Sequence, residues 1–178
     1  MSGTPEAIVD LAPGDTRLDL ETIFAAQYGR IARVIARVLR DPARAEELAV
    51  EVFLKWSRTS AAQGLAAEGW LYRTAVRASL DELRRQTRRG RFEPLLDSGP
   101  APPTPEELQS SQEDRDRVRA VLAALPPRQA EMLLLRSDGL SYEEVASVLE
   151  MNPSSVGTLL SRAQQAFRKE FVKRYGDR

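Results

Sequence analysis

The sequence contains neither cysteine nor histidine among its 178 residues. Without cysteine, the chain has neither a disulfide framework nor a thiolate metal site. The absence of histidine removes the commonest general base and the commonest metal ligand. A glycine-rich phosphate-binding loop is missing as well. We therefore expect no enzyme, no metal and no cofactor, although chemistry by isolated Asp or Glu side chains stays open.

Long apolar runs and an excess charge of one sign are also missing. No apolar stretch approaches the length of a membrane span, and the start of the chain, MSGTPEAIVDLAPGD, does not have the pattern of a secretion signal. We expect a soluble, cytoplasmic protein without membrane insertion. The 26 basic and 26 acidic residues balance to a net charge of zero. Such neutrality is unusual for a protein that binds nucleic acid unaided.

The stretch from Leu125 to Phe171 predicts three helices separated by compact stop and start signals. A proline pair opens the first helix, a glycine ends it, a capping box opens the second, and a cap followed by proline opens the third. These signals are Pro126–Pro127, Gly139, Ser141 with Glu144, and Asn152 with Pro153. The spacing of the last two helices is typical of a helix-turn-helix, whose second helix enters the major groove of DNA.

The last predicted helix carries small polar side chains near its start. Its apolar face consists of Val156, Leu159 or Leu160, Ala163 and Phe167. Small side chains and the partial positive charge of a helix N-terminus both favour close approach to phosphates. The opposite face carries the candidate contacts Ser154, Ser155, Gly157, Thr158, Ser161 and Arg162. A plain three-helix bundle with a solvated last helix fits the same pattern.

The first half of the chain predicts a short tail followed by three long helices. Residues 1–16 form the tail, and the helices run from Leu18 to Leu39, from Pro42 to about Ser57 and from about Gly69 to Arg89. Each has an apolar stripe at helical spacing, so residues 17–90 are expected to form one small domain. The second helix has an acidic ridge on its outer side, which fits either solubility or a binding role: Glu46, Glu47 and Glu51.

Arginines crowd the end of the third of these helices. Cations stabilise a helix C-terminus, which accounts for one or two of them. Five within eight residues favour phosphate contact in addition. The five are Arg84, Arg85, Arg88, Arg89 and Arg91.

A change in composition marks a linker at residues 91–111, where prolines and acids replace the arginines. Roughly twenty residues span up to about 65 Å at about 3.3 Å each, close to the length of two turns of B-DNA, about 70 Å. Ser110 or Ser111 is expected to cap a helix that starts at Gln112 and opens a domain at 112–178. The predicted fold is all-α: two small helical domains joined by a Pro-rich linker, the second containing the helix-turn-helix.

Three segments, with their order and spacing, resemble bacterial sigma factors of the extracytoplasmic-function (ECF) group in the sigma-70 family. The segments are DPARAEELAVEVFLKW, GWLYRTAVRASLDELRR and LPPRQAEMLLLRSDGLSYEEVASVL, and the resemblance covers about residues 18 to 172. It implies that residues 17–90 correspond to region 2, which binds RNA polymerase and the promoter −10 element. It likewise implies that residues 112–178 correspond to region 4, which reads the −35 element.

The resemblance also implies roles for individual positions. The surface that binds polymerase would consist of Glu46, Glu47, Leu48, Glu51, Phe53 and Leu54. The −10 side would consist of Trp70, Arg73, Arg77, Asp81, Arg84, Arg85 and Arg88. The −35 side would use the exposed set of the last helix, from Ser154 to Arg162, given above.

The chain departs from the family pattern at four positions. Val50 stands where glutamine is usual, and Arg77 stands where asparagine is frequent. Gly157 and Leu159 occupy positions at which similar sequences often carry lysine and arginine. Because Arg and Lys make the commonest base-specific contacts, we expect weaker direct base reading here, with phosphate contacts and DNA shape contributing more.

The leading hypothesis is a non-enzymatic RNA polymerase sigma factor for a dedicated set of genes, associated with the nucleoid when bound to polymerase. Its expected partners are the RNA polymerase core, promoter DNA and an anti-sigma factor or other protein regulator. The alternatives are a sigma-like scaffold or decoy and a free-standing helix-turn-helix regulator.

Overall fold

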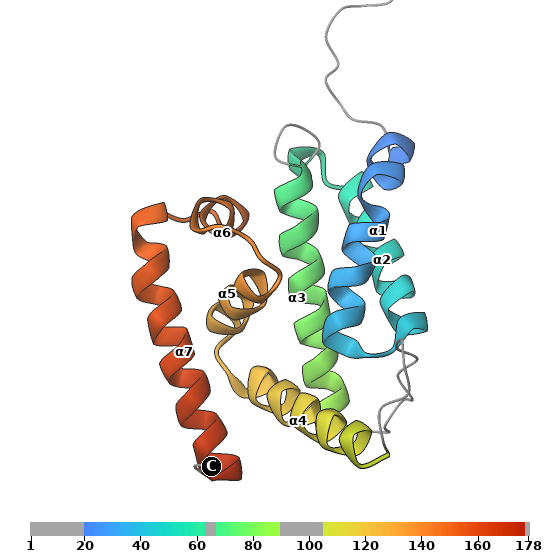
Figure 1. Ribbon diagram of the computed structural model, residues 1–178. Coiled ribbons are helices and arrows are strands. Elements are labelled where there is room, and N and C mark those ends of the chain that lie inside the picture. Colours follow the sequence, from blue (N-terminus) through green and yellow to red (C-terminus); the bar gives the residue numbers. More distant parts are fainter. Residues whose placement is uncertain (1–19, 63–66, 90–104, 177–178) are drawn as a thin grey trace, which may run out of the picture.

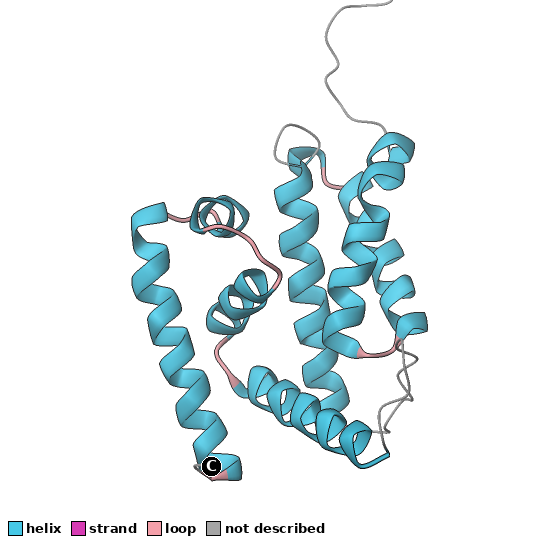
Figure 2. Cartoon of the chain, in the orientation of Figure 1, coloured by secondary structure: helices cyan, strands magenta, loops and turns pink. Residues whose placement is uncertain are grey.

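The computed structural model describes residues 20–62, 67–89 and 105–176, and every regular element in these ranges is helical (Figures 1 and 2). This confirms the predicted all-α class. Within these ranges no helix combines the length and apolar character that a membrane crossing requires. In chain order the elements are α1 (Leu20–Leu39), α2 (Pro42–Ser57), the 3-10 turn η1 (Ser60–Ala62), α3 (Ala67–Arg88), α4 (Pro105–Ala124), α5 (Pro127–Ser137), α6 (Tyr142–Leu149) and α7 (Pro153–Tyr175).

The N-terminal unit consists of α1, α2 and α3. Asp41 caps α2 by accepting a hydrogen bond from the Arg44 amide at 3.0 Å, and Pro42 is the first helical residue, as predicted. The apolar stripes of the three helices meet in a core that contains Phe53 and Trp56. The buried indole N–H of Trp56 donates to the Ala62 carbonyl at 2.9 Å. The turn η1 thereby gives this polar atom a partner.

The C-terminal unit consists of α4 to α7, and its turns follow the predicted signals. Gly139 has φ +91°. Its amide donates to the Arg136 carbonyl at 3.1 Å, and the next amide donates to Leu135 at 3.3 Å. This pair of bonds is a Schellman motif, which needs a left-handed residue at the Gly139 position. The predicted glycine cap of α5 is confirmed.

The two predicted starts in the helix-turn-helix are confirmed as well. The Ser141 hydroxyl accepts from the Glu144 amide at 3.2 Å, and the Ser141 amide donates to the Glu144 carboxylate at 2.6 Å. These reciprocal bonds form the predicted capping box. Asn152 accepts from the Ser154 amide at 3.0 Å, with Pro153 at the first position of α7. Helix α7 buries Val156, Leu160 and Ala163, as its apolar stripe predicts.

Some helix boundaries differ from the predictions. Helix α4 begins at Pro105, so the predicted cap at Ser110 or Ser111 is wrong, and the predicted linker 91–111 overlaps the first turns of α4. Pro105 followed by Glu106 and Glu107 is itself a helix start signal, but the same proline also fits the end of the Pro-rich linker. Helix α3 begins at Ala67, two residues before the predicted start at Gly69. The predicted tail and linker positions 90–104 lie outside the described residues.

Helix α3 lies at the centre of the molecule, between α1 and α2 on one side and the C-terminal unit on the other (Figure 1). The buried hydrophobic residues form one cluster that includes members of both units. The two units therefore pack directly against each other. An arrangement in which each unit occupies a separate DNA element would require them to move apart.

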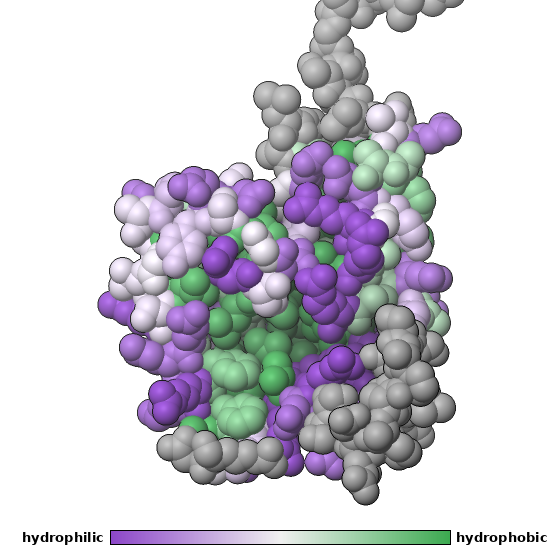
Figure 3. Space-filling view, viewed as in Figure 1, coloured by the Kyte–Doolittle hydropathy of each residue, from purple (hydrophilic) through white to green (hydrophobic). Residues whose placement is uncertain are grey.

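An apolar cavity of about 1150 Å³ lies where the end of α1 meets α4, α5 and α7. Figure 3 shows hydrophobic residues gathered in a hollow of this face, with hydrophilic residues around them. Apolar side chains in the cavity wall include Val118, Leu122, Leu133 and Phe167.

Candidate functional site

The outer face of α2 carries both acidic and apolar side chains. Leu54 is 44% exposed and Val50 is 41% exposed, and the three ridge carboxylates lie beside them in the exposed class: Glu46, Glu47 and Glu51. Arg44 lies 2.8 Å from Glu47 and 3.2 Å from Glu51. The hydrogen bond that Arg44 donates to the Glu47 carboxylate is the largest cause that raises the Arg44 pKa. The ridge is thus partly neutralised at one end.

Leu48 and Phe53, two residues predicted for the same surface, point the other way. Leu48 is 5% exposed and Phe53 is 1% exposed, because both fill the core of the N-terminal unit. The Phe53 ring packs against Phe24 with a centroid distance of 4.9 Å. Their assignment to a contact surface is therefore corrected: both side chains pack in the core, on the inner face of α2. Val50 and Leu54 supply the exposed apolar part of this face instead.

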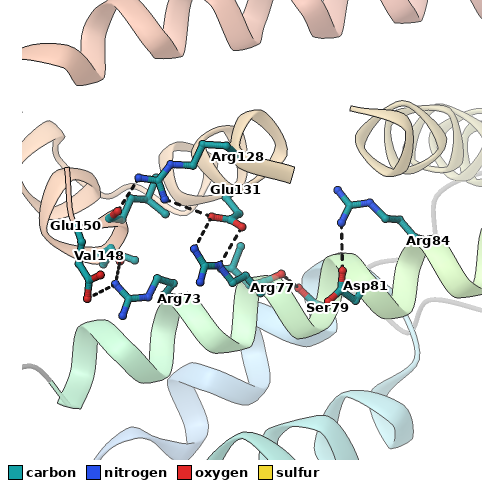
Figure 4. A network of polar contacts seen from close by, with 11 residues as sticks. Arg73, Arg77, Ser79, Asp81, Arg84, Arg128, Glu131, Val148 and Glu150 are labelled. Carbon is teal, nitrogen blue, oxygen red and sulfur yellow. Dashed lines mark hydrogen bonds and ion pairs between the residues drawn. The ribbon is translucent and has the colours of Figure 1, made fainter. Parts of the chain in front are cut away.

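A row of arginines on α3 faces the C-terminal unit, as Figure 4 shows. Arg77 meets Glu131 of α5, with 3.0 Å from Nε to Oε1. Arg73 lies 2.6 Å from the Glu150 carboxylate and donates to the Val148 carbonyl at 3.0 Å. Arg84 donates to the carbonyls of Ala123 and Leu125 at 3.3 and 3.4 Å. Three of the residues predicted for nucleic-acid contact therefore form the interface between the units.

Glu131 is the most buried carboxylate of this interface, with 6% of its side chain exposed. A buried carboxylate needs positively charged or hydrogen-bonding partners to offset its desolvation. Arg77 supplies one, and Arg128 lies 3.8 Å away as a second. Arg128 also donates to the Leu149 carbonyl at 2.6 Å, which links α5 to the end of α6.

A second group of contacts joins the end of α1 to the C-terminal unit. Arg37 pairs with Asp138, and Arg40 lies 3.1 Å from Asp116. Here an arginine of the C-terminal unit is the donor: Arg119 of α4 donates to the Val38 carbonyl of α1 at 2.8 Å. Burial lowers the pKa of Arg119 to about 10, and it stays charged at neutral pH. No local pattern predicts these contacts, because the partners are distant along the chain.

The remaining predicted residues of α3 stay accessible. Asp81, Arg85 and Arg88 are exposed, and Trp70 is partly buried. Arg85 reaches Glu82 at 3.1 Å within its own helix. The arginine cluster at the end of α3 is thus divided, since Arg84 faces the C-terminal unit while Arg85 and Arg88 face solvent.

The start of α7 is accessible, as the predicted recognition helix requires. Its exposed residues are Ser154, Thr158, Ser161 and Arg162, and its half-buried ones are Ser155 and Gly157. Gly157 faces the Tyr142 ring, which lies 3.6 Å from the position of an added Cβ. The Arg136 guanidinium lies over the same ring, 5.2 Å from its centroid. Tyr142 is an exposed aromatic neighbour of the start of α7 that was not among the predicted contacts.

The three surfaces suit binding to macromolecules. The outer face of α2 is acidic and apolar, α3 carries guanidinium groups that suit phosphates, and α7 presents small polar groups at a helix start. Among the described residues, no cluster of three or more carboxylates has the geometry of a metal site. The arrangement offers recognition groups on three helices.

Comparison with known proteins assigns two successive family domains to this chain. Residues 23–89 match the model of sigma-70 region 2, and residues 115–166 match the model of sigma-70 region 4. The first match begins within α1 and runs to the end of α3, and the second begins halfway along α4 and extends into α7. The α3 arginines and the start of α7 thus lie in different family domains.

Individual relatives agree with the two domain matches. The chain is 31% identical over 158 residues to the ECF RNA polymerase sigma factor SigK of Mycolicibacterium vanbaalenii, covering 82% of this chain and 80% of that protein. It is 32% identical over 150 residues to the ECF RNA polymerase sigma factor SigE of Mycolicibacterium smegmatis, covering 81% of this chain but 58% of that protein. The chain thus spans under two thirds of SigE.

A solved structure shares the fold. The sigma factor RpoE of Bartonella quintana, in complex with the anti-sigma factor NepR, superposes with a TM-score of 0.50 at 17% sequence identity. The match covers 85% of this chain and 96% of that one.

Proposed function

Because the chain belongs to the ECF group of RNA polymerase sigma factors, we propose that it is a non-catalytic subunit that directs core RNA polymerase to a dedicated set of promoters. The observation that carries this proposal is the succession of a region 2 match at 23–89 and a region 4 match at 115–166 in one chain. Polymerase docking and promoter reading are thereby combined in one protein. We place its action in the cytoplasm, at the nucleoid when it is bound to polymerase.

The outer face of α2 is our candidate for the polymerase contact. Its exposed side chains combine acidic groups with the apolar Val50 and Leu54. Burial of the apolar groups would supply affinity, and the carboxylates would favour a basic partner surface. Val50 replaces the glutamine usual in the family, so this contact would be less polar here.

Helix α3 and helix α7 are our candidates for the two promoter contacts. On α3, Arg73, Arg77, Arg84, Arg85 and Arg88 would bind the phosphates of the melted −10 strand, with Trp70 and Asp81 nearby. On α7, Arg162 and the small polar side chains would position the duplex at the −35 element. Zero net charge fits a protein whose DNA affinity comes largely from the polymerase to which it is bound.

Capture of purified core polymerase by the immobilised full chain tests the first contact. We expect Glu46→Lys combined with Leu54→Ala to lower capture, because the first change reverses charge and the second removes apolar contact area. Glu21→Lys, an exposed acid at the start of α1, is the matched control. A chain that fails to capture polymerase but shifts duplex DNA alone would be a free-standing helix-turn-helix regulator.

A protein regulator is a further proposed partner. The solved RpoE relative is bound to an anti-sigma factor, and we propose that this chain has an inhibitor of the same general kind. Co-purification from cells with a tagged chain, compared with a chain carrying the two α2 changes, tests whether such a partner competes with polymerase for α2.

A further inference from the structure

The apolar cavity at the end of α1 is large enough to hold a small molecule. Its volume of about 1150 Å³ slightly exceeds the roughly 300–1,000 Å³ typical of ligand pockets. Side chains of α1, α4, α5 and α7 supply the wall, and the hollow with its hydrophobic floor is visible in Figure 3. An apolar body placed here is removed from water on several sides, which favours its binding.

The charged side chains of the cavity wall are mostly basic. Among the described residues, the wall contains four arginines and one aspartate, although the whole chain has no net charge. A concave surface lined by charges of one sign attracts ligands of the opposite sign. The wall therefore combines an apolar surface with an excess of positive charge. The arginines are Arg37, Arg40, Arg115 and Arg119, and the aspartate is Asp114.

Two of these arginines share one carboxylate. The Nη1 atoms of Arg40 and Arg119 each lie 3.1 Å from Oδ1 of Asp116. Both guanidinium groups are largely withdrawn from water, with 14% and 10% of their side chains exposed. Two positive charges and one negative charge leave this cluster with an excess of one positive charge. A buried charge without a partner is costly, so the cluster favours a further anion.

Two more observations concern the same pair of arginines. Nη2 of Arg40 is buried and donates to no acceptor among the described residues. Burial is the largest cause that lowers the pKa of Arg119, and the neighbouring Arg40 charge is the next. A bound anion supplies an acceptor and reduces the repulsion between the two guanidinium groups.

The backbone at Arg40 does not favour a side chain. Arg40 has φ of 57° at the end of α1, a left-handed conformation in which glycine is the usual residue. Any residue with a Cβ costs free energy in this conformation. A binding role for the guanidinium accounts for an arginine at this position.

We propose that this cavity binds a small amphipathic carboxylate. Its carboxylate group lies against Arg40 and Arg119, because the fork of guanidinium donors matches the two oxygens of a carboxylate. Its aliphatic or aromatic body packs on Val118, Leu122 and Phe167. The single charge of a carboxylate matches the excess of one positive charge in the cluster, whereas a phosphate monoester carries about two. None of the wall residues belongs to the three recognition surfaces described above, so this site is additional to the proposed function.

The probes are octanoate, decanoate and dodecanoate, each added to the full chain below its micelle-forming concentration. Isothermal titration calorimetry measures Kd. We expect the affinity to rise about fourfold for each methylene buried. Dodecanol and dodecyl phosphate, with other head groups on the same chain length, should both bind more weakly than dodecanoate. In methyl NMR spectra, dodecanoate should shift the signals of Val118 and Leu122 but not those of Val50 on the outer face of α2.

Arg40→Gln removes one partner of the carboxylate group. It should weaken dodecanoate binding by about tenfold or more, the loss typical of a hydrogen bond between charged groups. Arg168→Gln, which changes an exposed arginine of α7 outside the cavity wall, is the matched control. If Arg40→Gln prevents folding, Arg40→Gly is the second variant, because glycine accepts the left-handed backbone. It should unfold at no lower temperature than the parent and still bind dodecanoate weakly.

Val118→Glu tests the apolar part of the wall. It places a fixed carboxylate in the cavity, which should weaken dodecanoate binding by repulsion and by competition for the arginines. Leu20→Glu, at a similarly exposed apolar residue of α1 outside the cavity wall, is the control and should bind as the parent does.

Equal dodecanoate affinity of the Arg40→Gln and Arg168→Gln chains overturns the proposal. Equal affinity for dodecanol and dodecanoate also overturns it, because the arginines would then contribute nothing. Tighter binding of dodecyl phosphate overturns the choice of a carboxylate, and a parent chain that binds none of the probes overturns the site itself. All these measurements are made without polymerase or DNA, so their outcome is independent of the proposed function.

Discussion

Arg77 and Glu131 join the two halves of the protein through a forked contact. The Nε–Oε1 distance is 3.0 Å and the Nη2–Oε2 distance is 3.5 Å. The two residues are 54 positions apart in the chain. Half of the Arg77 side chain is exposed, at 50%, while Glu131 retains 6% exposure. Loss of the contact therefore affects the two residues differently. Arg77 is already half exposed to water, whereas the Glu131 carboxylate stays buried and loses its nearer positively charged partner.

We predict that Arg77→Ala lowers the free energy of unfolding by about 1–3 kcal/mol, the cost typical of a buried polar group that loses its partner. Urea unfolding followed by circular dichroism measures the change. Arg174→Ala breaks an ion pair with Glu170 within α7, outside the interface, and should change stability by less than about 1 kcal/mol. Equal effects of the two substitutions would show that the Arg77 contact does not stabilise the packing of the two units.

Gly139 and Gly29 are predicted to respond to alanine with opposite signs. Gly139 has φ +91°, so Gly139→Ala should destabilise the chain by about 1 kcal/mol or more. Gly29 lies inside α1, where an added Cβ would meet only the end of the Arg33 side chain at 3.8 Å. Gly29→Ala should stabilise by about 0.5–1 kcal/mol. Thermal unfolding of both variants checks the pair, and a neutral Gly139→Ala would contradict the Schellman assignment.

Local signals in the sequence predicted much of the fold because their partners lie within a few residues. The capping box of Ser141 and Glu144, the glycine at 139 and the start at Asn152 are examples. The start of α4 was missed because Pro105 lies at the end of a Pro-rich stretch, where a proline that opens a helix resembles one in a linker. The family resemblance assigned Leu48 and Phe53 to the binding surface of α2, whereas helical spacing puts Leu48, with Val52 or Phe53, on its apolar face. Leu48 and Phe53 are both buried in the core.

The interface between the two units could not be predicted from the sequence, for a different reason. Arg37 and Asp138 are 101 residues apart, and no local pattern selects one carboxylate among 26 acidic residues. Resemblance to a family predicted that the α3 arginines bind DNA. The alternative use of those arginines, as partners of the second unit, depends on how the two units pack.

The capping box predicts a specific pH dependence. The hydrogen bond from the Ser141 amide is the largest cause that lowers the pKa of Glu144 below its usual value. A carboxylate with a lowered folded-state pKa contributes stability above its unfolded pKa, and that contribution is lost as pH falls through the folded pKa. Glu144→Gln should therefore destabilise the chain at neutral pH, and the difference from the parent should shrink in acid. Unfolding series at several pH values measure this difference, and a gap that stays constant into acid would contradict the capping assignment.

Arg162 is predicted to contact a phosphate or base edge of the −35 duplex. With polymerase bound, Arg162→Ala should weaken duplex binding and reduce the slope of log affinity against log salt by about one. Arg168→Ala, an exposed arginine farther along α7, is the control and should leave the slope unchanged. A salt titration of binding to promoter duplex decides the point. If Arg162→Ala matches the parent at low salt, Arg162 is not a DNA contact.

Transcription by purified core polymerase on a genomic promoter library, with and without the chain, tests whether the chain directs polymerase to promoters. We expect new start sites that depend on the added chain and share two upstream elements at a fixed spacing. The chain with Arg85→Ala and Arg88→Ala should yield fewer open complexes at the same sites, because both exposed arginines are assigned to the melted strand. If no start site rises above the level of core polymerase alone, the chain does not direct promoter choice and is a sigma-like scaffold or decoy.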